Sequence, residues 1–268
     1  MMVDVNSPDV FPAHDDTATI EGLCATVVER LGPTLSFGLR CVVALSGSVA
    51  VGKSTLSEAL ARALRAQGLE TAVVSTDGFL LPNRVLEPLG LAYVKGLPHT
   101  YDWYALRRFI RAAADARIAL RVPVYSHTSF DADGTATIPP GNMVIVEGVN
   151  ALHALLDDCR DLCIFVDADT EVIAGWYIAR FLGLIQAAET DPSSFYARFV
   201  MCNAAARIEI ARSVWDSINL PNLEQHIAPT KRSAEIVVTL GPDHSIINLR
   251  SKFPAKTRSV AQLSALVK

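Results

Sequence analysis

The sequence predicts a single α/β domain built on a mainly parallel sheet that is flanked by helices. Two observations carry this prediction. Short apolar runs rich in β-branched residues alternate along the chain with longer segments of helical spacing, as in repeated strand–helix–strand units. A glycine-rich loop also joins the first of these runs to the first long helical segment: Gly47-Ser48-Val49-Ala50-Val51-Gly52-Lys53-Ser54-Thr55. With 268 residues, of which 50% are hydrophobic, the chain can bury one large core.

The individual elements follow from this alternation. The expected strands are short apolar runs bounded by turn residues or by a change to helical spacing, and they cover 41–45, 71–75, 122–125, 143–146, 162–166 and 235–240. The expected helices are longer, and they cover 56–67, 104–116, 171–184 and 195–214. Turn-forming residues at 131–134 and 139–142 enclose a short extended segment, which we expect to leave the sheet as a hairpin.

Composition limits the kind of partner that the protein can bind. The net charge of -4 and the isoelectric point of about 5.9 provide no basic field, so we expect a small-molecule partner, no nucleic acid and no membrane. The most apolar helical segment, 171–185, is interrupted by Arg180, and residues 1–16 lack the pattern of a signal peptide. We therefore expect a cytoplasmic protein with a mobile leader at 1–20, the folded domain at 21–255 and a tail at 256–268.

The five cysteines are odd in number and scattered, which is typical of free thiols in a reducing compartment. Cys159 and Cys163 are close in sequence, but no second pair of ligands lies near them. We therefore expect no metal site at these cysteines.

The loop at 47–55 has the residues needed to bind a nucleoside triphosphate. Its glycines let the backbone wrap around phosphate oxygens, and the N-terminus of the following helix adds partial positive charge. Lys53 is expected to reach the β- and γ-phosphates, and the Ser54 hydroxyl is expected to hold Mg²⁺. The loop therefore predicts a nucleoside triphosphate enzyme or a nucleotide-dependent switch.

Polar residues also stand at the ends of the expected strands. The second strand leads to Asp77, the third to Tyr125 and His127, the fourth to Glu147 and the fifth to Asp167. One acidic residue at a strand end is often only a helix cap. Parallel strands bring their carboxyl ends to one edge, however, so we expect these side chains to lie together beside the triphosphate.

Two of these carboxylates suit phosphoryl transfer. Asp77 is the candidate base that accepts the proton of an acceptor hydroxyl, although an Asp before Gly also commonly forms a turn. Glu147 is placed like an acidic residue that organises Mg²⁺ or its waters.

A face of the helix at 171–184 supplies a positive charge. Tyr177, Arg180 and Phe181 share this face by their spacing. An Arg there is costly to bury unless it meets an anion, and a phosphate is the natural partner. The alternatives are that Arg180 extends to solvent or pairs with Asp169 or Asp191.

Together these residues resemble the bacterial, or type I, pantothenate kinases, within the uridine kinase and phosphoribulokinase group of P-loop kinases. The resemblance runs from about residue 42 to 249. Besides the loop at 47–55, it rests on the motifs at 76–80, 82–83, 95–98, 123–127, 147–150, 176–182, 190–192, 218–219 and 229–230. It implies the P-loop kinase fold, and it implies ATP-dependent phosphorylation, with Mg²⁺, of the primary hydroxyl of pantothenate, the first step toward coenzyme A. A homodimer is compatible with the resemblance.

The resemblance also implies a role for each matching residue. It makes Asp77 the base, Lys53 and Arg180 the phosphate clamps, and Ser54 and Glu147 the Mg²⁺ residues. Around the acceptor it places Lys95, Tyr125, His127, Tyr177 and Asn219. Three aromatic residues could wall the apolar part of the acceptor, although aromatics at this helical spacing are as often plain core: Phe195, Tyr196 and Phe199.

Two other functions stay open at this point. One is a related kinase that acts on another small alcohol, such as a nucleoside, a sugar or a hydroxy acid. The other is a nucleotide-dependent switch or a binding protein that senses a metabolite. Asp77 speaks against the second, because a switch needs no base for an acceptor hydroxyl.

Overall fold

The protein is described by a computed structural model over residues 18–252. The predicted tail at 256–268 and all but the last three residues of the predicted leader at 1–20 lie outside this range. The helices are α1 (Ile20–Leu35), α2 (Lys53–Ala66), α3 (Asn83–Leu86), α4 (Trp103–Ala113), α5 (Thr170–Ala188), α6 (Ala204–Val214) and α7 (Leu220–Asn222). The strands are β1 (Cys41–Gly47), β2 (Thr71–Ser75), β3 (Leu120–Ser126), β4 (Asp131–Ile138), β5 (Met143–Glu147), β6 (Leu162–Asp167), β7 (Ile236–Leu240) and β8 (Ile246–Ser251).

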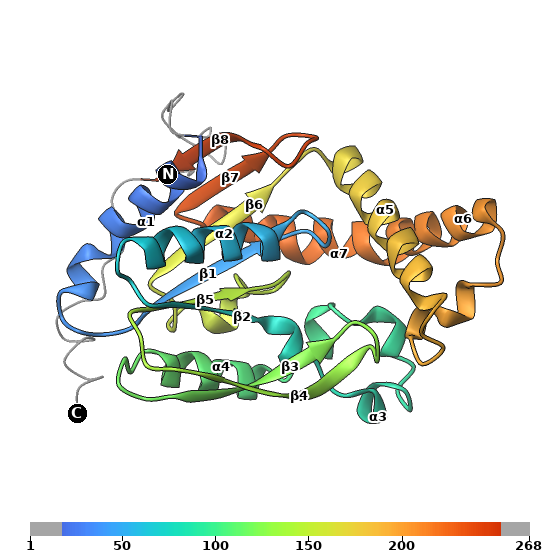
Figure 1. The fold of residues 1–268 in the computed structure, drawn as a ribbon, viewed down its shortest axis with the longest axis horizontal. Coiled ribbons are helices and arrows are strands. Elements are labelled where there is room, and N and C mark those ends of the chain that lie inside the picture. The colour runs from blue at the N-terminus through green and yellow to red at the C-terminus, as the bar shows by residue number, and fades with distance from the viewer. Residues whose placement is uncertain (1–17, 253–268) are drawn as a thin grey trace, which may run out of the picture.

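A six-stranded sheet forms the centre of the single domain, in the order β2-β5-β1-β6-β7-β8 (Figure 1). All neighbouring strands run parallel except β8, which pairs antiparallel with β7. The predicted α/β fold with a mainly parallel sheet is therefore confirmed. Leu45 of β1 and Ser75 of β2 both lie in register with Glu147, so the carboxyl ends of β1, β2 and β5 are level.

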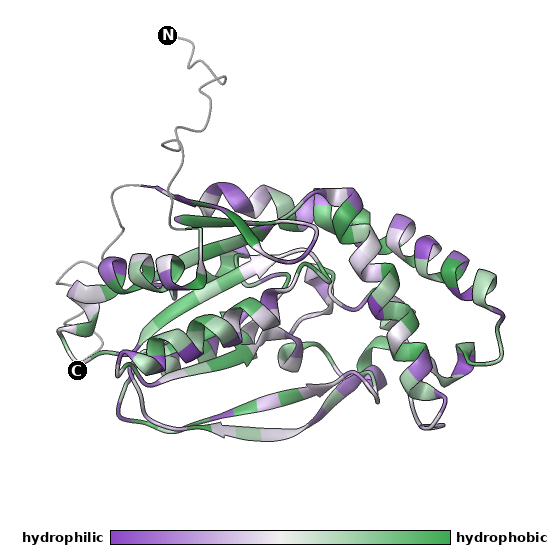
Figure 2. Ribbon diagram, turned by 45° about the horizontal axis from the view of Figure 1, so that its top comes forward, coloured by the Kyte–Doolittle hydropathy of each residue, from purple (hydrophilic) through white to green (hydrophobic). Residues whose placement is uncertain are grey.

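Burial of the central strands on both faces explains why they read as continuous apolar runs. All residues of β1 and β5 are buried. Val43 and Leu45 of β1 belong to the core cluster that includes α1 and α2, whereas Val42 belongs to the cluster that includes α4. Figure 2 shows the same contrast, with apolar central strands and helices of mixed hydropathy around them.

The third predicted strand does not belong to the sheet, and its expected place on the parallel edge is wrong. Strand β3 pairs antiparallel with β4 as a separate hairpin, and most of β4 is exposed to solvent. The hairpin itself was expected, but the predicted turn at 131–134 lies inside β4. Arg40 is 1% exposed and secures the base of the hairpin beside β1 by donating to the carbonyls of Ile118 (3.2 Å) and Pro139 (2.9 Å).

The predicted helix at 195–214 is interrupted. It consists of the short 3-10 helix η5 (Phe195–Phe199) and α6, which begins where the side chain of Asn203 accepts a hydrogen bond from the Ala206 amide (2.9 Å). Elements that were not predicted include α1, α3, β8 and the helical turns between 215 and 233.

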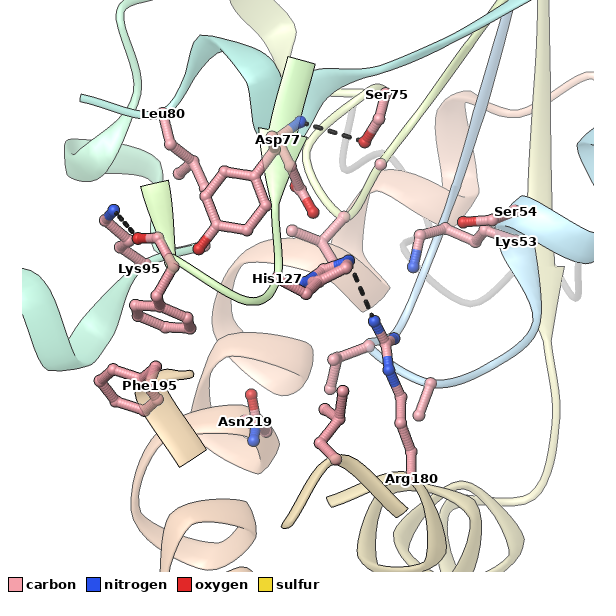
Figure 3. A pocket seen from close by; sticks show the side chains of 18 of the residues that line it. Lys53, Ser54, Ser75, Asp77, Leu80, Lys95, His127, Arg180, Phe195 and Asn219 are labelled. Carbon is pink, nitrogen blue, oxygen red and sulfur yellow. Dashed lines mark hydrogen bonds between the residues drawn. The ribbon is translucent and has the colours of Figure 1, made fainter. Parts of the chain in front are cut away.

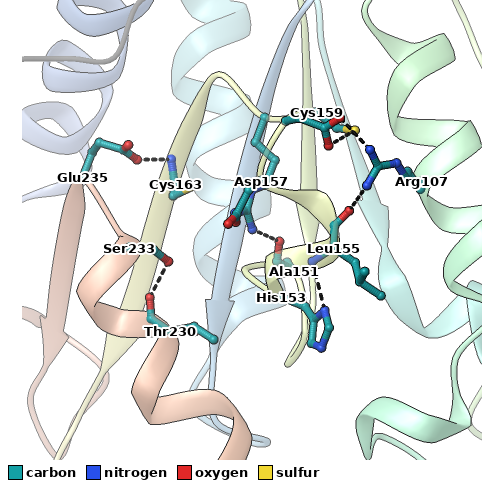
Figure 4. Close-up of polar contacts among 12 residues, drawn as sticks. Arg107, Ala151, His153, Leu155, Asp157, Cys159, Cys163, Thr230, Ser233 and Glu235 are labelled. Carbon is teal, nitrogen blue, oxygen red and sulfur yellow. Dashed lines mark hydrogen bonds and ion pairs between the residues drawn. The ribbon is translucent and has the colours of Figure 1, made fainter.

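Polar contacts around the start of β6 hold two buried cysteines in place (Figure 4). The amide of Cys163 donates to Glu235 Oε2 at 2.8 Å, and the thiol of Cys159 donates to Asp158 Oδ1 at 3.2 Å. Burial raises the pKa of the Cys163 thiol to about 12, so it stays a neutral core residue at physiological pH. Between residues 18 and 252, no helix combines the length and the hydropathy needed to cross a membrane.

Candidate active site

A cavity of about 580 Å³ opens beside the carboxyl ends of β1, β2 and β5, and its volume is ordinary for a small-molecule site. Hairpin β3–β4, helix α5 and η5 form its other walls. It brings together every side chain predicted for catalysis, metal binding or acceptor binding: Lys53, Ser54, Asp77, Lys95, Tyr125, His127, Glu147, Tyr177, Arg180, Phe195, Tyr196, Phe199 and Asn219. Of the other predicted strand-end residues, Asp167 does not line it, because its carboxylate pairs with Lys231 (2.5 Å).

The glycine-rich loop wraps tightly between β1 and α2. Gly47 lies so close to β6 that a Cβ atom there would be 2.4 Å from the carbonyl oxygen of Val166. Gly52 precedes α2 with a φ of +96°, a conformation that strains any residue with a side chain. The loop therefore presents backbone amides and the N-terminus of α2 to an anion.

Lys53 is a buried cation held at this loop. Its Nζ donates to the carbonyl of Ser48 at 2.7 Å, and the residue is 8% exposed. Burial lowers the pKa of Lys53, while the charges of Glu147 and Asp77 oppose that shift. A phosphate in the cavity would stabilise the charged ammonium in the same way.

Ser54 and Glu147 lie together beside Lys53. The hydroxyl of Ser54 donates to Glu147 Oε1 at 3.0 Å, and Glu147 is 6% exposed. Burial raises the pKa of Glu147, and the charge of Lys53 opposes that shift. Hydroxyl and carboxylate oxygens are the ligands that Mg²⁺ prefers, and Mg²⁺ usually takes its remaining ligands from substrate phosphates and water. This pair fits such an ion, and no group of three His, Cys, Asp or Glu side chains elsewhere in the described range offers an alternative cage.

Asp77 follows β2 in the short 3-10 helix η1 (Thr76–Phe79), so it does stand in a turn. Its carboxylate nevertheless lines the cavity and accepts a hydrogen bond from the hydroxyl of Tyr101 at 3.4 Å. Burial raises the pKa of Tyr101 far above its usual value, so this hydroxyl stays protonated and can only donate to the carboxylate. Asp77 is thus held in place with its carboxylate available to a ligand.

Arg180 points from α5 toward His127 (Figure 3). Its Nη2 lies 3.3 Å from His127 Nε2. Burial and the neighbouring guanidinium lower the pKa of His127, which favours a neutral ring whose Nε2 accepts from Arg180. Asp169 instead caps α5 and Asp191 accepts from Ser193, so neither forms the alternative ion pair with Arg180.

Figure 3 places Lys53 and Ser54 on one side of the cavity and Lys95 and Phe195 on the other, with Asp77 and His127 between them. The ammonium of Lys95 donates to the carbonyl of Phe130 at 2.6 Å and lies 3.5 Å from Asp131 Oδ1, so its charge is already paired. Its predicted role as a donor to the acceptor stays a prediction.

Tyr177 and Asn219 add neutral polar groups to the lining of the cavity. Burial raises the pKa of Tyr177 to about 12. Both side chains are therefore uncharged hydrogen-bonding groups at neutral pH.

The aromatic residues of η5 are both core and cavity wall. Tyr196 is 9% exposed and belongs to a small core cluster with Phe181 and Ile185, yet it also lines the cavity. Phe195 stacks on Phe130 with ring centroids 4.3 Å apart. These aromatics therefore belong both to the core and to the lining of the cavity, and their role as a wall for the acceptor stays a prediction.

Several site residues were missed in the sequence. Tyr101, Phe130 and Asn222 meet the cavity residues through contacts between distant segments, and nothing local to them signals this. Asn150 and Asn222 both donate to the carbonyl of Gly96, at 2.8 and 3.3 Å, and so anchor the segment that carries Lys95. Asn150 could have been found, because it ends the motif at 147–150.

Comparisons with known proteins agree with this geometry. A model of the phosphoribulokinase and uridine kinase family matches residues 42–182. Pantothenate kinase of Klebsiella pneumoniae (strain 342) is 35% identical over 84% of this chain and 76% of its own length. Pantothenate kinase of Myxococcus xanthus (strain DK1622) is 40% identical over 78% of this chain and 71% of its own length. A crystal structure from Silicibacter sp. TM1040, described as a candidate fructose transport system kinase, has a TM-score of 0.63 and 31% identity, covering 77% of this chain and 92% of that one.

Proposed function

The chain belongs to the phosphoribulokinase and uridine kinase family, and from that membership we propose that it transfers the γ-phosphate of ATP to the primary hydroxyl of pantothenate. Kinase activity is supported above all by the position of Asp77, between the phosphate loop and the opposite wall of the cavity. The choice of pantothenate rests on the pantothenate kinases that are 35% and 40% identical to this chain. The product would enter coenzyme A synthesis.

The chain's own residues account for each part of the transfer. The acceptor hydroxyl donates to the Asp77 carboxylate, which takes its proton as the oxygen attacks the γ-phosphorus. The bond between that phosphorus and the bridging oxygen breaks, and ADP leaves. Because the transition state is loose, positioning and charge do most of the work, and Lys53 and Arg180 supply positive charge to the phosphoryl oxygens.

Ser54 and Glu147 are the residues that would hold Mg²⁺. The ion would neutralise phosphate charge when bound. The raised pKa of Glu147 reflects its burial without a full counter-charge, which a divalent cation would supply.

A second, smaller hollow of about 480 Å³ adjoins the loop and suits the base of the nucleotide. Gly52 and Thr55 of the loop line it, together with His244, which stacks on Trp176 with ring centroids 3.9 Å apart. A base attached to a triphosphate on the loop would reach this hollow.

The cytoplasmic location and the homodimer stay predictions.

The opposite side of the cavity suits pantothenate. Tyr177 and Asn219 offer neutral hydrogen bonds for its second hydroxyl and amide, and the rings of Phe195 and Phe199 offer apolar surface for its methyl groups. His127 lies near the reacting end because it contacts Arg180 at 3.3 Å, and Tyr125 packs edge-on against His127 with ring centroids 5.3 Å apart.

Release of ADP from the purified protein tests the proposal. We expect Mg²⁺-dependent ADP release with pantothenate, and little with uridine, fructose or D-glycerate. The Asp77→Asn variant is the control for acceptor-dependent transfer. Efficient turnover of one of the other acceptors in place of pantothenate would overturn the choice of substrate, and ATP turnover that no acceptor stimulates would favour a nucleotide switch.

A further inference from the structure

Two stacked rings with a cation at each end line the acceptor side of the cavity. Lys95 Nζ lies 5.3 Å from the centre of the Phe130 ring, and Phe130 stacks on Phe195. On Phe195 lies the guanidinium of Arg198, with its central carbon 4.0 Å from the ring centre. Lys95, Phe130, Phe195 and Arg198 all line the cavity.

Among the described residues, the charge of Arg198 is not paired with a carboxylate, and unlike Lys53 and Arg180 this cation lies on the Phe195 side of the cavity. Its Nε donates to the carbonyl of Phe195 at 2.9 Å, which fixes the guanidinium against the ring. Within residues 18–252 no carboxylate lies within 4.0 Å of it, whereas Lys95 pairs with Asp131. The two terminal nitrogens of Arg198 therefore remain available as a planar pair of donors.

The position of Arg198 relative to Asp77 sets what these donors can reach. Figure 3 shows Phe195, on which Arg198 lies, across the cavity from Lys53, with Asp77 between. An acceptor whose hydroxyl meets Asp77 can extend its other end toward Phe195 and Arg198, which also line the cavity. Pantothenate carries its carboxylate about 10 Å from its primary hydroxyl, on standard bond lengths. When the hydroxyl meets Asp77, this anion would therefore lie at the far end of the acceptor.

We propose that Arg198 binds the carboxylate of the acceptor and thereby selects an anionic over a neutral substrate. This inference rests on the proposed function, because it requires that the acceptor be pantothenate. A guanidinium that is already held against a ring loses little conformational entropy when it binds a carboxylate through two parallel hydrogen bonds. Hydrogen bonds to charged groups of this kind correspond to about 10- to 100-fold in affinity.

The test compares pantothenate with pantothenyl alcohol, in which a neutral CH₂OH group replaces the carboxylate. The Arg198→Gln variant should raise the KM for pantothenate about 10-fold or more, leave kcat within about twofold, and leave the KM for pantothenyl alcohol unchanged. Arg198→Lys should recover only part of the loss, because an ammonium lacks the planar fork. Arg212→Gln is the matched control, since Arg212 is exposed on α6 and does not line the cavity.

The outcomes separate this inference from the proposed function. Arg198 does not bind the carboxylate if Arg198→Gln raises the KM for pantothenate and for pantothenyl alcohol equally, or raises neither. The same conclusion holds if the unmodified enzyme does not prefer pantothenate to its alcohol. In both cases the pantothenate kinase activity stands. If the unmodified enzyme phosphorylates neither compound, the proposed function fails and this inference fails with it.

Discussion

Single side chains around the transferred phosphate have different environments, and these determine what each can do. Lys53 is buried against a backbone carbonyl, Asp77 accepts from one buried tyrosine, and Arg180 contacts a histidine rather than a carboxylate. The charge of Arg180 is therefore available to a phosphate, which the sequence left undecided. The role of Asp77 as a base is a chemical inference that its position makes testable.

Asp77→Asn should bind ATP normally and lose turnover at least about 100-fold, because an amide cannot accept the hydroxyl proton. The loop at 47–55 and Lys53 are untouched, so nucleotide binding measured by titration should be that of the unmodified enzyme. Near-normal turnover of Asp77→Asn at saturating pantothenate would show that another group takes the proton.

Arg180→Ala should lower turnover about 100-fold with a smaller effect on the KM for pantothenate. The reason is that we assign the charge of Arg180 to the phosphoryl group in the transition state. Arg180→Lys should restore turnover only in part, since an ammonium cannot engage two oxygens in one plane. Steady-state kinetics of both variants check this. Unchanged turnover with a raised KM for the acceptor would instead assign Arg180 to acceptor binding.

His127 should make activity sensitive to acid. Its pKa is lowered from 6.5 by burial and by Arg180, so the ring is neutral above about pH 6.5 in both the folded and the unfolded chain. As the pH falls below that value, the unfolded chain takes up the proton first and folding stability declines; below the folded pKa the charged ring repels Arg180. We expect kcat/KM to be flat near pH 6.5 and above it, and to fall only when the pH drops below the lowered pKa of His127 in the folded enzyme. His127→Gln should remove this inflection, and an unaltered acid limb in that variant would assign it to another group, such as Glu147.

Among the elements, the hairpin β3–β4 shows most clearly where sequence patterns succeed and fail. The strands of the parallel sheet were predicted to within a few residues, because burial on both faces leaves an unmistakable apolar run. Strand β3 has a similar composition, but its partner is β4 and its side chains are only partly buried. Strand pairing is a long-range property, and a short apolar run in the sequence does not indicate which strand it will pair with.

Contact between this hairpin and η1 depends on Gly78. A Cβ atom at Gly78 would lie 2.1 Å from the carbonyl oxygen of Pro123 in β3, and backbone cannot yield there as a flexible side chain would. Gly78→Ala should therefore push the hairpin away from Asp77, destabilise the protein by about 1–3 kcal/mol and raise the KM for the acceptor. Denaturant unfolding and kinetics measure the two effects.

Gly175→Ala is the matched control for that variant. Gly175 lies inside α5, and a Cβ atom there would meet nothing within 4 Å, so alanine should stabilise the helix by up to about 1 kcal/mol. If Gly78→Ala proves as stable as the unmodified protein and has the same KM, the hairpin does not depend on this close approach.

Over the whole molecule, the cavity has a phosphate side that could be predicted from the sequence and an acceptor side that could not. The phosphate side comes from a continuous motif, residues 47–55, so its chemistry could be predicted from spacing alone. The acceptor side is assembled from the hairpin, α5, η5 and the turn at Asn219, and its residues were assigned to the acceptor only through family resemblance. Its details, such as the pairing of Lys95 with Asp131 and the free guanidinium of Arg198, arise from packing between distant segments.

Competition among acceptors is the sharpest test of pantothenate as the substrate. The enzyme is given ATP, Mg²⁺ and an equimolar mixture of pantothenate, uridine, fructose and D-glycerate, and mass spectrometry identifies which compound carries the phosphate in the first few per cent of reaction. We expect phosphopantothenate to predominate, and we expect the Asp77→Asn variant to form almost none. Predominant phosphorylation of any other acceptor in the mixture would contradict this expectation.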